Sequence, residues 1–85
     1  MISKEISAFF WDVNVDTFDP LLYSQYTLGR LLEYGDEKAV AWMKAHFSGD
    51  LIRQAIRTDR RLSRRSANFW ALVYGIPSTE VVALS

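Results

Sequence analysis

Hydrophobic residues recur at helical spacing from position 19 onward, and each periodic stretch is bounded by residues that begin or end helices. Asp19-Pro20 is a typical helix start, Ser63 can cap a later helix, and Gly35 and Gly75 are typical helix ends. The pattern therefore predicts helices over residues 20–34, 36–47, 50–57, 63–74 and 77–84.

The same periodicity assigns an inward face to the predicted helices. Trp42 and Trp70 occupy core-facing positions, where large aromatic side chains usually lie. The inward residues of the 50–57 helix are predicted to be Leu51, Ile52, Ala55 and Ile56. Those of the 63–74 helix are predicted to be Ala67, Phe69, Trp70, Val73 and Tyr74.

Residues 1–18 follow a different pattern. Aromatic and aliphatic residues alternate with polar ones between positions 9 and 16, which favours extended structure. A second strand is not evident in the sequence, so we expect an extended arm that lays its aromatic residues over a helical core of residues 19–85. Pairing of this arm with a partner's sheet is the alternative. Phe9, Phe10 and Trp11 cannot all face one side, so at least one is expected to meet solvent or another chain.

These patterns predict an all-α fold, as one compact domain of about five short helices over residues 1–85. The chain has 85 residues, 49% of them hydrophobic, which is too apolar for intrinsic disorder. The N-terminus does not resemble a signal peptide, and no apolar run approaches the roughly 18 residues of a membrane span. We therefore expect a cytoplasmic protein.

The sequence lacks the residue sets that common enzymes and metal sites need. It has no cysteine and a single histidine, His46, and its glycines do not form a phosphate-binding loop. Asp12, Asn14 and Asp16 match the start of a calcium-binding EF-hand loop. That loop then requires glycine where Thr17 stands, and it ends in glutamate at its twelfth position, which Tyr23 occupies. We expect a non-enzymatic protein without catalytic residues, metal or cofactor.

Charge is unevenly distributed although the formal net charge is zero. Residues 1–47 carry four basic and seven acidic side chains, a sum of −3, and residues 48–85 carry six basic and three acidic ones, a sum of +3. All six basic residues of the second half are arginines between positions 53 and 65, where Asp59 is the only acid. Such a local excess of positive charge indicates an anionic partner.

The arginines fall within a predicted helix, turn and helix, an order that resembles a helix-turn-helix motif. The second helix of that motif reads DNA bases from its first residues, and Asn68 would lie one turn beyond the arginines. The predicted contact residues are Arg53, Arg57, Arg60, Arg61, Arg64, Arg65 and Asn68. The negative charge that faces these arginines has three possible sources: a nucleic acid, an acidic protein partner, or carboxylates of the same chain.

Several short strings carry a resemblance to a known family. They are Phe9-Phe10-Trp11-Asp12, Leu32-Glu33-Tyr34-Gly35-Asp36, Arg60-Arg61-Leu62-Ser63, Asn68-Phe69-Trp70-Ala71 and Gly75-Ile76-Pro77. Together they resemble a family of small, uncharacterised bacterial and archaeal helical domains, often encoded beside nucleotidyltransferase-type toxin genes of the abortive-infection kind. The resemblance implies a regulatory or antitoxin-like setting, without any catalytic residues.

We therefore predict a non-enzymatic, antitoxin-like regulatory module that binds duplex DNA through its arginine-rich face. The alternative is a protein-interaction module that docks a partner, such as a toxin-like nucleotidyltransferase, through the arginines or through Phe9, Phe10 and Trp11. A second copy of the chain, giving a homodimer, is a further candidate partner. The two functions are distinguished by the state of the arginines: exposure on one face favours DNA binding, whereas pairing with carboxylates of the same chain counts against it.

Overall fold

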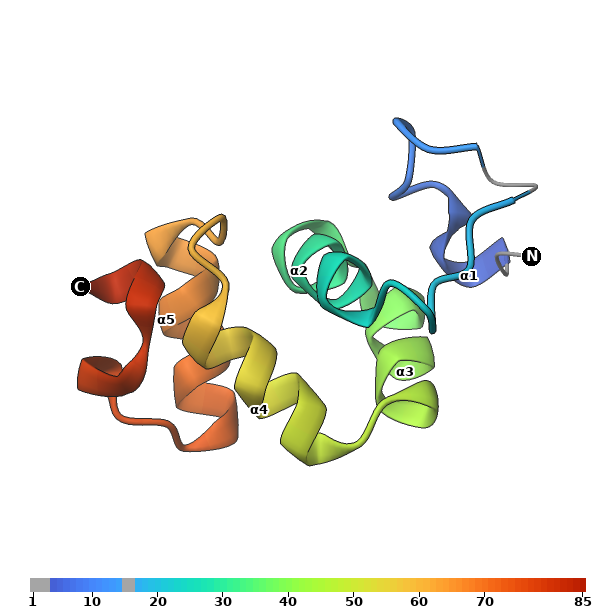
Figure 1. Ribbon diagram of the computed structural model, residues 1–85. Helices are drawn as coiled ribbons and strands as arrows, with labels where there is room; N and C mark the ends of the chain where they lie inside the picture. The colour runs from blue at the N-terminus through green and yellow to red at the C-terminus, as the bar shows by residue number, and fades with distance from the viewer. Residues whose placement is uncertain (1–3, 15–16) are drawn as a thin grey trace.

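Within the residues that the structure describes, the chain forms five α-helices and two short 3-10 turns (Figure 1). The computed structural model describes residues 4–14 and 17–85. Its elements are α1 (Lys4–Ser7), α2 (Ser24–Tyr34), α3 (Glu37–His46), α4 (Gly49–Thr58), α5 (Arg64–Tyr74), η1 (Ser78–Glu80) and η2 (Val82–Leu84). The described residues form no strand, so the all-α prediction is confirmed.

Three helices begin at side chains that cap them. Asp36 accepts a hydrogen bond from the Ala39 amide at the start of α3, at 2.9 Å. Ser48 and Ser63 accept equivalent bonds at the starts of α4 and α5. Each cap satisfies one of the amides that the first turn of a helix leaves without a backbone partner.

The start of α2 differs from the prediction. Asp19 Oδ1 accepts the amides of Leu21 and Leu22 at 3.0 and 3.3 Å, as a helix cap would. Only a turn follows, however, and α2 begins at Ser24. Competition of this kind between a local side-chain bond and the helix is typical of aspartate, which favours turns as well as caps.

Helix α2 holds the two halves of the molecule together. It contacts α3 on one side and both α4 and α5 on the other, while α1 packs on α3 (Figure 1). Trp70 of α5 lies at this junction with 7% of its surface exposed, and its indole N–H donates to the Leu32 carbonyl of α2 at 2.7 Å. The prediction that Trp70 lies in the core is confirmed, and its polar N–H is satisfied there.

The N-terminal segment packs on the core, but its described residues are not extended. Residues 4–7 form α1, and turns follow through residue 12. Ile6 and Phe10 are 0% and 1% exposed, whereas Trp11 is 66% exposed. The three adjacent aromatic residues therefore do divide between core and solvent. Residues 15 and 16, which include the Asp16 of the calcium-loop comparison, lie outside the described residues.

Three residues predicted to face inward are exposed. Phe69 and Val73 of α5 and Leu51 of α4 expose 56%, 50% and 47% of their surface. In α5 the buried face consists of Ala67, Trp70 and Ala71. At about 100° per residue, Phe69 and Val73 lie more than 100° from the centre of that face, so they cannot share it.

Candidate nucleic-acid interface

The arginine-rich part of the chain is the turn of residues 59–63 between α4 and α5. Helix α4 ends where the Asp59 amide donates to the Ala55 carbonyl at 3.0 Å. Four residues later Ser63 caps α5, which ends at Gly75 in the left-handed conformation, with φ of 66°. The predicted order of helix, turn and helix is therefore present.

A buried carboxylate organises this turn. The Asp59 side chain is 3% exposed, and its Oδ1 accepts the Arg61 amide at 2.9 Å and the Arg61 Nε at 3.3 Å. Its Oδ2 is also buried and has no hydrogen-bond partner among the described residues. An aspartate that accepts bonds from the residue two positions later stabilises a tight turn.

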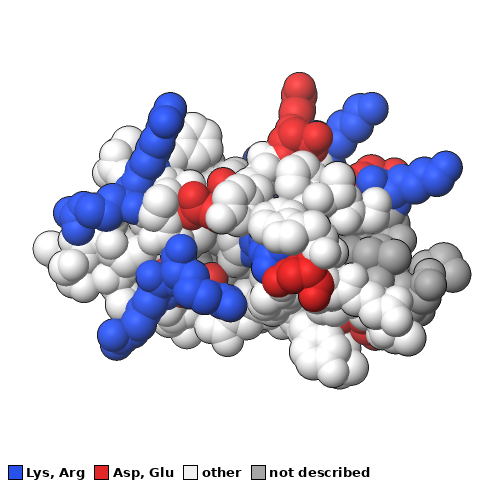
Figure 2. All heavy atoms as spheres, turned by 90° about the horizontal axis from the view of Figure 1, so that it is seen from above, with Lys and Arg blue, Asp and Glu red and all other residues white. Residues whose placement is uncertain are grey.

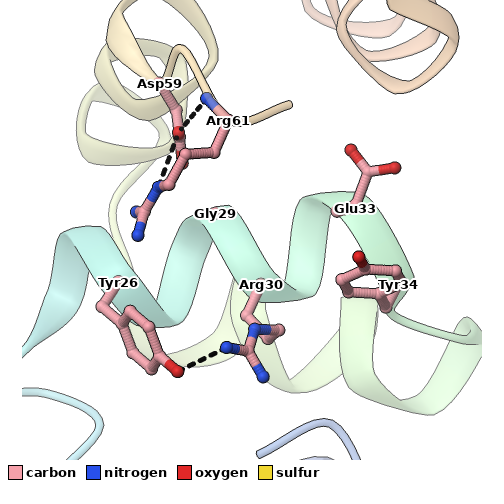
Figure 3. A pocket seen from close by; sticks show the side chains of 7 residues that line it. All are labelled: Tyr26, Gly29, Arg30, Glu33, Tyr34, Asp59 and Arg61. Atoms are coloured by element: carbon pink, nitrogen blue, oxygen red, sulfur yellow. Dashed lines mark hydrogen bonds and ion pairs between the residues drawn. The ribbon is translucent and has the colours of Figure 1, made fainter. Parts of the chain in front are cut away.

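The turn rests on α2 because Gly29 leaves room for the carboxylate. Figure 3 shows Asp59 and Arg61 reaching α2 at Gly29. A Cβ atom at this position would lie 2.0 Å from Asp59 Oδ2, far inside contact distance. Glu33, one helical turn later, accepts the Ser63 amide at 2.7 Å. Two attachments, at Gly29 and Glu33, therefore fix the turn on α2.

A shallow pocket of about 190 Å³ lies beside these attachments (Figure 3). Its walls are the α2 side chains Tyr26, Arg30, Glu33 and Tyr34 together with Asp59 and Arg61. The guanidinium of Arg61 lies 5.7 Å from the centre of the Tyr26 ring. Since Arg61 is engaged on this side by Asp59 and Tyr26, it contributes less free positive charge than the sequence suggests.

The six predicted arginines divide into two groups of three. The paired group consists of Arg53 with Asp50 at 3.7 Å, Arg57 with Glu80 at 3.2 Å and Arg61 with Asp59 at 3.3 Å. The other group is Arg60, Arg64 and Arg65, which are exposed and have no ion pair within residues 4–14 and 17–85. The expectation of one arginine face is thus only partly met.

The unpaired group lies where the turn passes into α5. Arg60 belongs to the turn, Arg64 and Arg65 form the first turn of α5, and the exposed Asn68 follows on the same helix. Figure 2 shows basic side chains projecting from the part of the molecule that carries α4 and α5, on the left. This surface therefore carries three positive charges without a carboxylate partner in the described part of the chain, next to an exposed amide side chain.

The aromatic segment of the N-terminus forms a second exposed feature. The Arg30 guanidinium lies 4.4 Å from the Trp11 ring centre and binds both oxygens of Asp12, at 3.1 and 2.8 Å. Trp11 meets Tyr34 edge to face, with ring centres 5.5 Å apart. Of the three residues predicted to form a protein interface, Phe10 is buried, Phe9 is partly buried and Trp11 is exposed.

The Asp12–Arg30 pair shifts the titration of both groups. Hydrogen bonds from Arg30 and, secondly, from the Tyr26 hydroxyl lower the pKa of the Asp12 carboxyl from 3.8 to about 2. The same bond to Asp12 raises the pKa of Arg30. Because Arg30 also donates to the Phe9 carbonyl at 3.0 Å, this pair fastens the N-terminal segment to α2.

A family of sequences, DUF6922, matches residues 6–56, which is more than half of the chain. The chain belongs to this family. DUF6922 is a family of unknown function, so membership does not assign an activity. No curated protein and no solved structure is significantly similar to the chain. The DUF6922 match includes Asp12, Gly29 and Arg30 and ends within α4, before Arg57 and all of α5.

None of the described helices has the length and apolar character needed to cross a membrane.

Sequence reasoning missed two features of this region. The first is the contact between Gly29 and Asp59, which lie thirty residues apart in the chain. The second is the exposed apolar surface of α5. The signal for it was present, because Arg65, Phe69 and Leu72 follow one another at the i, i+4, i+7 spacing of a single helix face.

We predict that Gly29→Ala destabilises the fold. Alanine usually stabilises a helix interior by roughly 1 kcal/mol relative to glycine. Here the added methyl group meets the buried Asp59 carboxylate, so we expect the free energy of unfolding to fall by about 1–3 kcal/mol. The matched control is Gly49→Ala, whose Cβ would meet only the mobile end of Arg53, at 3.2 Å. Denaturant unfolding measures both variants; equal stability of the two would contradict the close approach of Gly29 and Asp59.

We also predict a pH-dependent contribution of Asp12 to stability. A folded-state pKa below 3.8 means that this contribution is present above pH 3.8 and is lost as the pH falls through about 2. Asp12→Asn should therefore melt at a lower temperature than the wild type near neutral pH, with the difference disappearing toward pH 2. Asp50→Asn is the control, because its pair with Arg53 is long and solvent-exposed. A difference that is independent of pH would refute the assignment.

Proposed function

We propose that this domain is a non-enzymatic, antitoxin-like regulatory module that binds duplex DNA through the surface of Arg60, Arg64 and Arg65. The observation that carries the proposal is that these three arginines are exposed and form no ion pair with any other described residue, Arg60 in a fixed turn and Arg64 and Arg65 at the start of the capped helix that follows. The regulatory role comes from the resemblance to domains encoded beside toxin genes, and no catalytic step is assigned.

The chemistry of this surface suits the DNA backbone. Arginine presents a planar set of N–H donors that matches phosphate oxygens, and three such side chains can each neutralise one phosphate. The first turn of α5 adds backbone amides and the positive end of the helix dipole. Two like charges in the first turn of a helix, Arg64 and Arg65, disfavour the isolated helix, and a bound anion would relieve that cost.

Asn68 is the candidate for base recognition. It is exposed one helical turn after Arg64 and Arg65, within the part of a recognition helix that reaches base edges. Its amide can pair with the N6 and N7 atoms of adenine in the major groove. We therefore assign phosphate contacts to the arginines and sequence preference to Asn68.

The second candidate function is docking of a partner protein, such as a toxin-like nucleotidyltransferase. The observation in its favour is the exposed aromatic pair of Trp11 and Tyr34, 66% and 55% exposed, which DNA binding at α5 would leave unused. Exposed aromatic side chains of this kind are common at protein interfaces.

The salt dependence of DNA binding tests the proposal. Three neutralised phosphates predict that the logarithm of the association constant falls against the logarithm of salt concentration with a slope of about −2.7. Replacing Arg64 and Arg65 together with alanine should flatten the slope by nearly two units, because two phosphate contacts are lost. The matched control replaces Arg53 and Arg57, which removes the same charge from side chains that are already paired and should change the slope little.

Asn68→Ala should leave the slope unchanged and lose about 1–3 kcal/mol of discrimination at one base position. Fluorescence anisotropy with labelled duplexes, including the promoter of the gene itself, measures all four proteins. Absence of binding at low salt, or equal flattening by both double replacements, would count against the DNA interface and favour partner docking.

A further inference from the structure

The outward face of α5 is basic at its start and apolar over its last two turns. Arg65, Phe69 and Leu72 lie along one line of this face, and Val73 lies beside them. Phe69, Leu72 and Val73 are 56%, 74% and 50% exposed, and Leu72 is the most exposed large hydrophobic residue of the described chain. Isolated exposed leucines are ordinary, but three adjacent apolar side chains on one helix are typical of an interaction surface.

DNA phosphates do not explain this apolar part of α5. Phosphate and sugar contacts use charged and polar groups, which Phe69, Leu72 and Val73 do not offer. The apolar side chains need a partner that offers apolar surface in return. A second α5 helix offers the same apolar surface, and self-complementary contacts of this kind are the basis of two-fold symmetric dimers.

From this arrangement we infer that two copies of the chain associate by packing α5 against α5 in antiparallel orientation, through Phe69, Leu72 and Val73. The charges of α5 fit this arrangement. The antiparallel orientation places the basic first turn of each helix toward the last turn of the other, where carbonyl groups carry partial negative charge. A parallel pair would instead bring two copies of Arg64 and Arg65 together.

Two further features agree with a second copy as the occupant. The formal net charge of the chain is zero, so two copies do not repel each other at long range. In addition, Arg60 lies in the turn before α5, and Arg64 lies about 100° around the helix from Arg65, so a contact along the line of Arg65, Phe69 and Leu72 leaves Arg60 and Arg64 accessible. The dimer does not depend on DNA binding, and its test uses the protein without DNA.

The experiment is sedimentation velocity of the wild type and two variants across a hundredfold range of micromolar concentration. The wild type should approach twice the 9.8 kDa mass of one chain at the highest concentration. Leu72→Glu should stay at the mass of one chain throughout, because it places two carboxylates in the apolar contact. The control is Leu22→Glu, which changes a residue of similar exposure, 70% against 74%, outside α5 and should associate as the wild type does.

Cross-linking gives a second readout, because the chain has no cysteine of its own. Leu72→Cys should form a disulfide-linked dimer on mild oxidation at concentrations where Leu22→Cys does not. Circular dichroism should show all variants folded, since both positions are exposed. The inference is overturned if the wild type is a monomer throughout, which would assign the apolar turns to a different protein, or if Leu72→Glu associates as strongly as the wild type.

Discussion

The carboxylate of Asp59 lies between α2 and the turn that leads into α5, and the rest of the arginine-rich region depends on it. Its Oδ1 holds the Arg61 amide and side chain, while Oδ2 fits against Gly29, where any larger residue would collide with it. The cost of burying this charge is offset by the bonds from Arg61 only in part, since Oδ2 has no partner among the described residues. A buried, partly satisfied carboxylate of this kind specifies one position for the turn and does not merely add stability.

This constraint decides which arginines are available to a ligand. Asp59 engages Arg61, and Glu80 and Asp50 engage Arg57 and Arg53, so the surface charge is smaller than the sequence suggests. What is left is the group of Arg60, Arg64 and Arg65 in the turn and at the start of α5. The backbone there is attached to α2 by the bond from the Ser63 amide to Glu33 and by the bond from the Trp70 indole N–H to the Leu32 carbonyl. Because the backbone that carries these side chains is fixed, phosphate binding would order less of the chain than it would on a mobile loop.

Local signals predicted much of this structure. The caps at Asp36 and Ser63, the left-handed Gly75 and the buried Trp70 all follow from residue type and spacing. The start of α2 was not predicted correctly. Asp19 accepts hydrogen bonds from two following amides, and such bonds occur in turns as well as at helix starts. Two contacts join residues far apart in the sequence: Gly29 with Asp59, and Arg57 with Glu80. Hydrophobic periodicity and helix propensity are local signals, so they do not predict such contacts. The Arg53–Asp50 pair, at i and i+3, was visible in the sequence.

The claim that residues 60–68 form the DNA-contacting surface is tested most directly by nuclear magnetic resonance. Titration of a short duplex into ¹⁵N-labelled protein at low salt reports on each backbone amide separately. The account predicts that the largest shift changes fall on the turn and the first turn of α5, with smaller ones near Gly29 and Glu33 of α2, on which the turn rests. Shift changes confined to the segment around Trp11, or none at all at low salt, would contradict it.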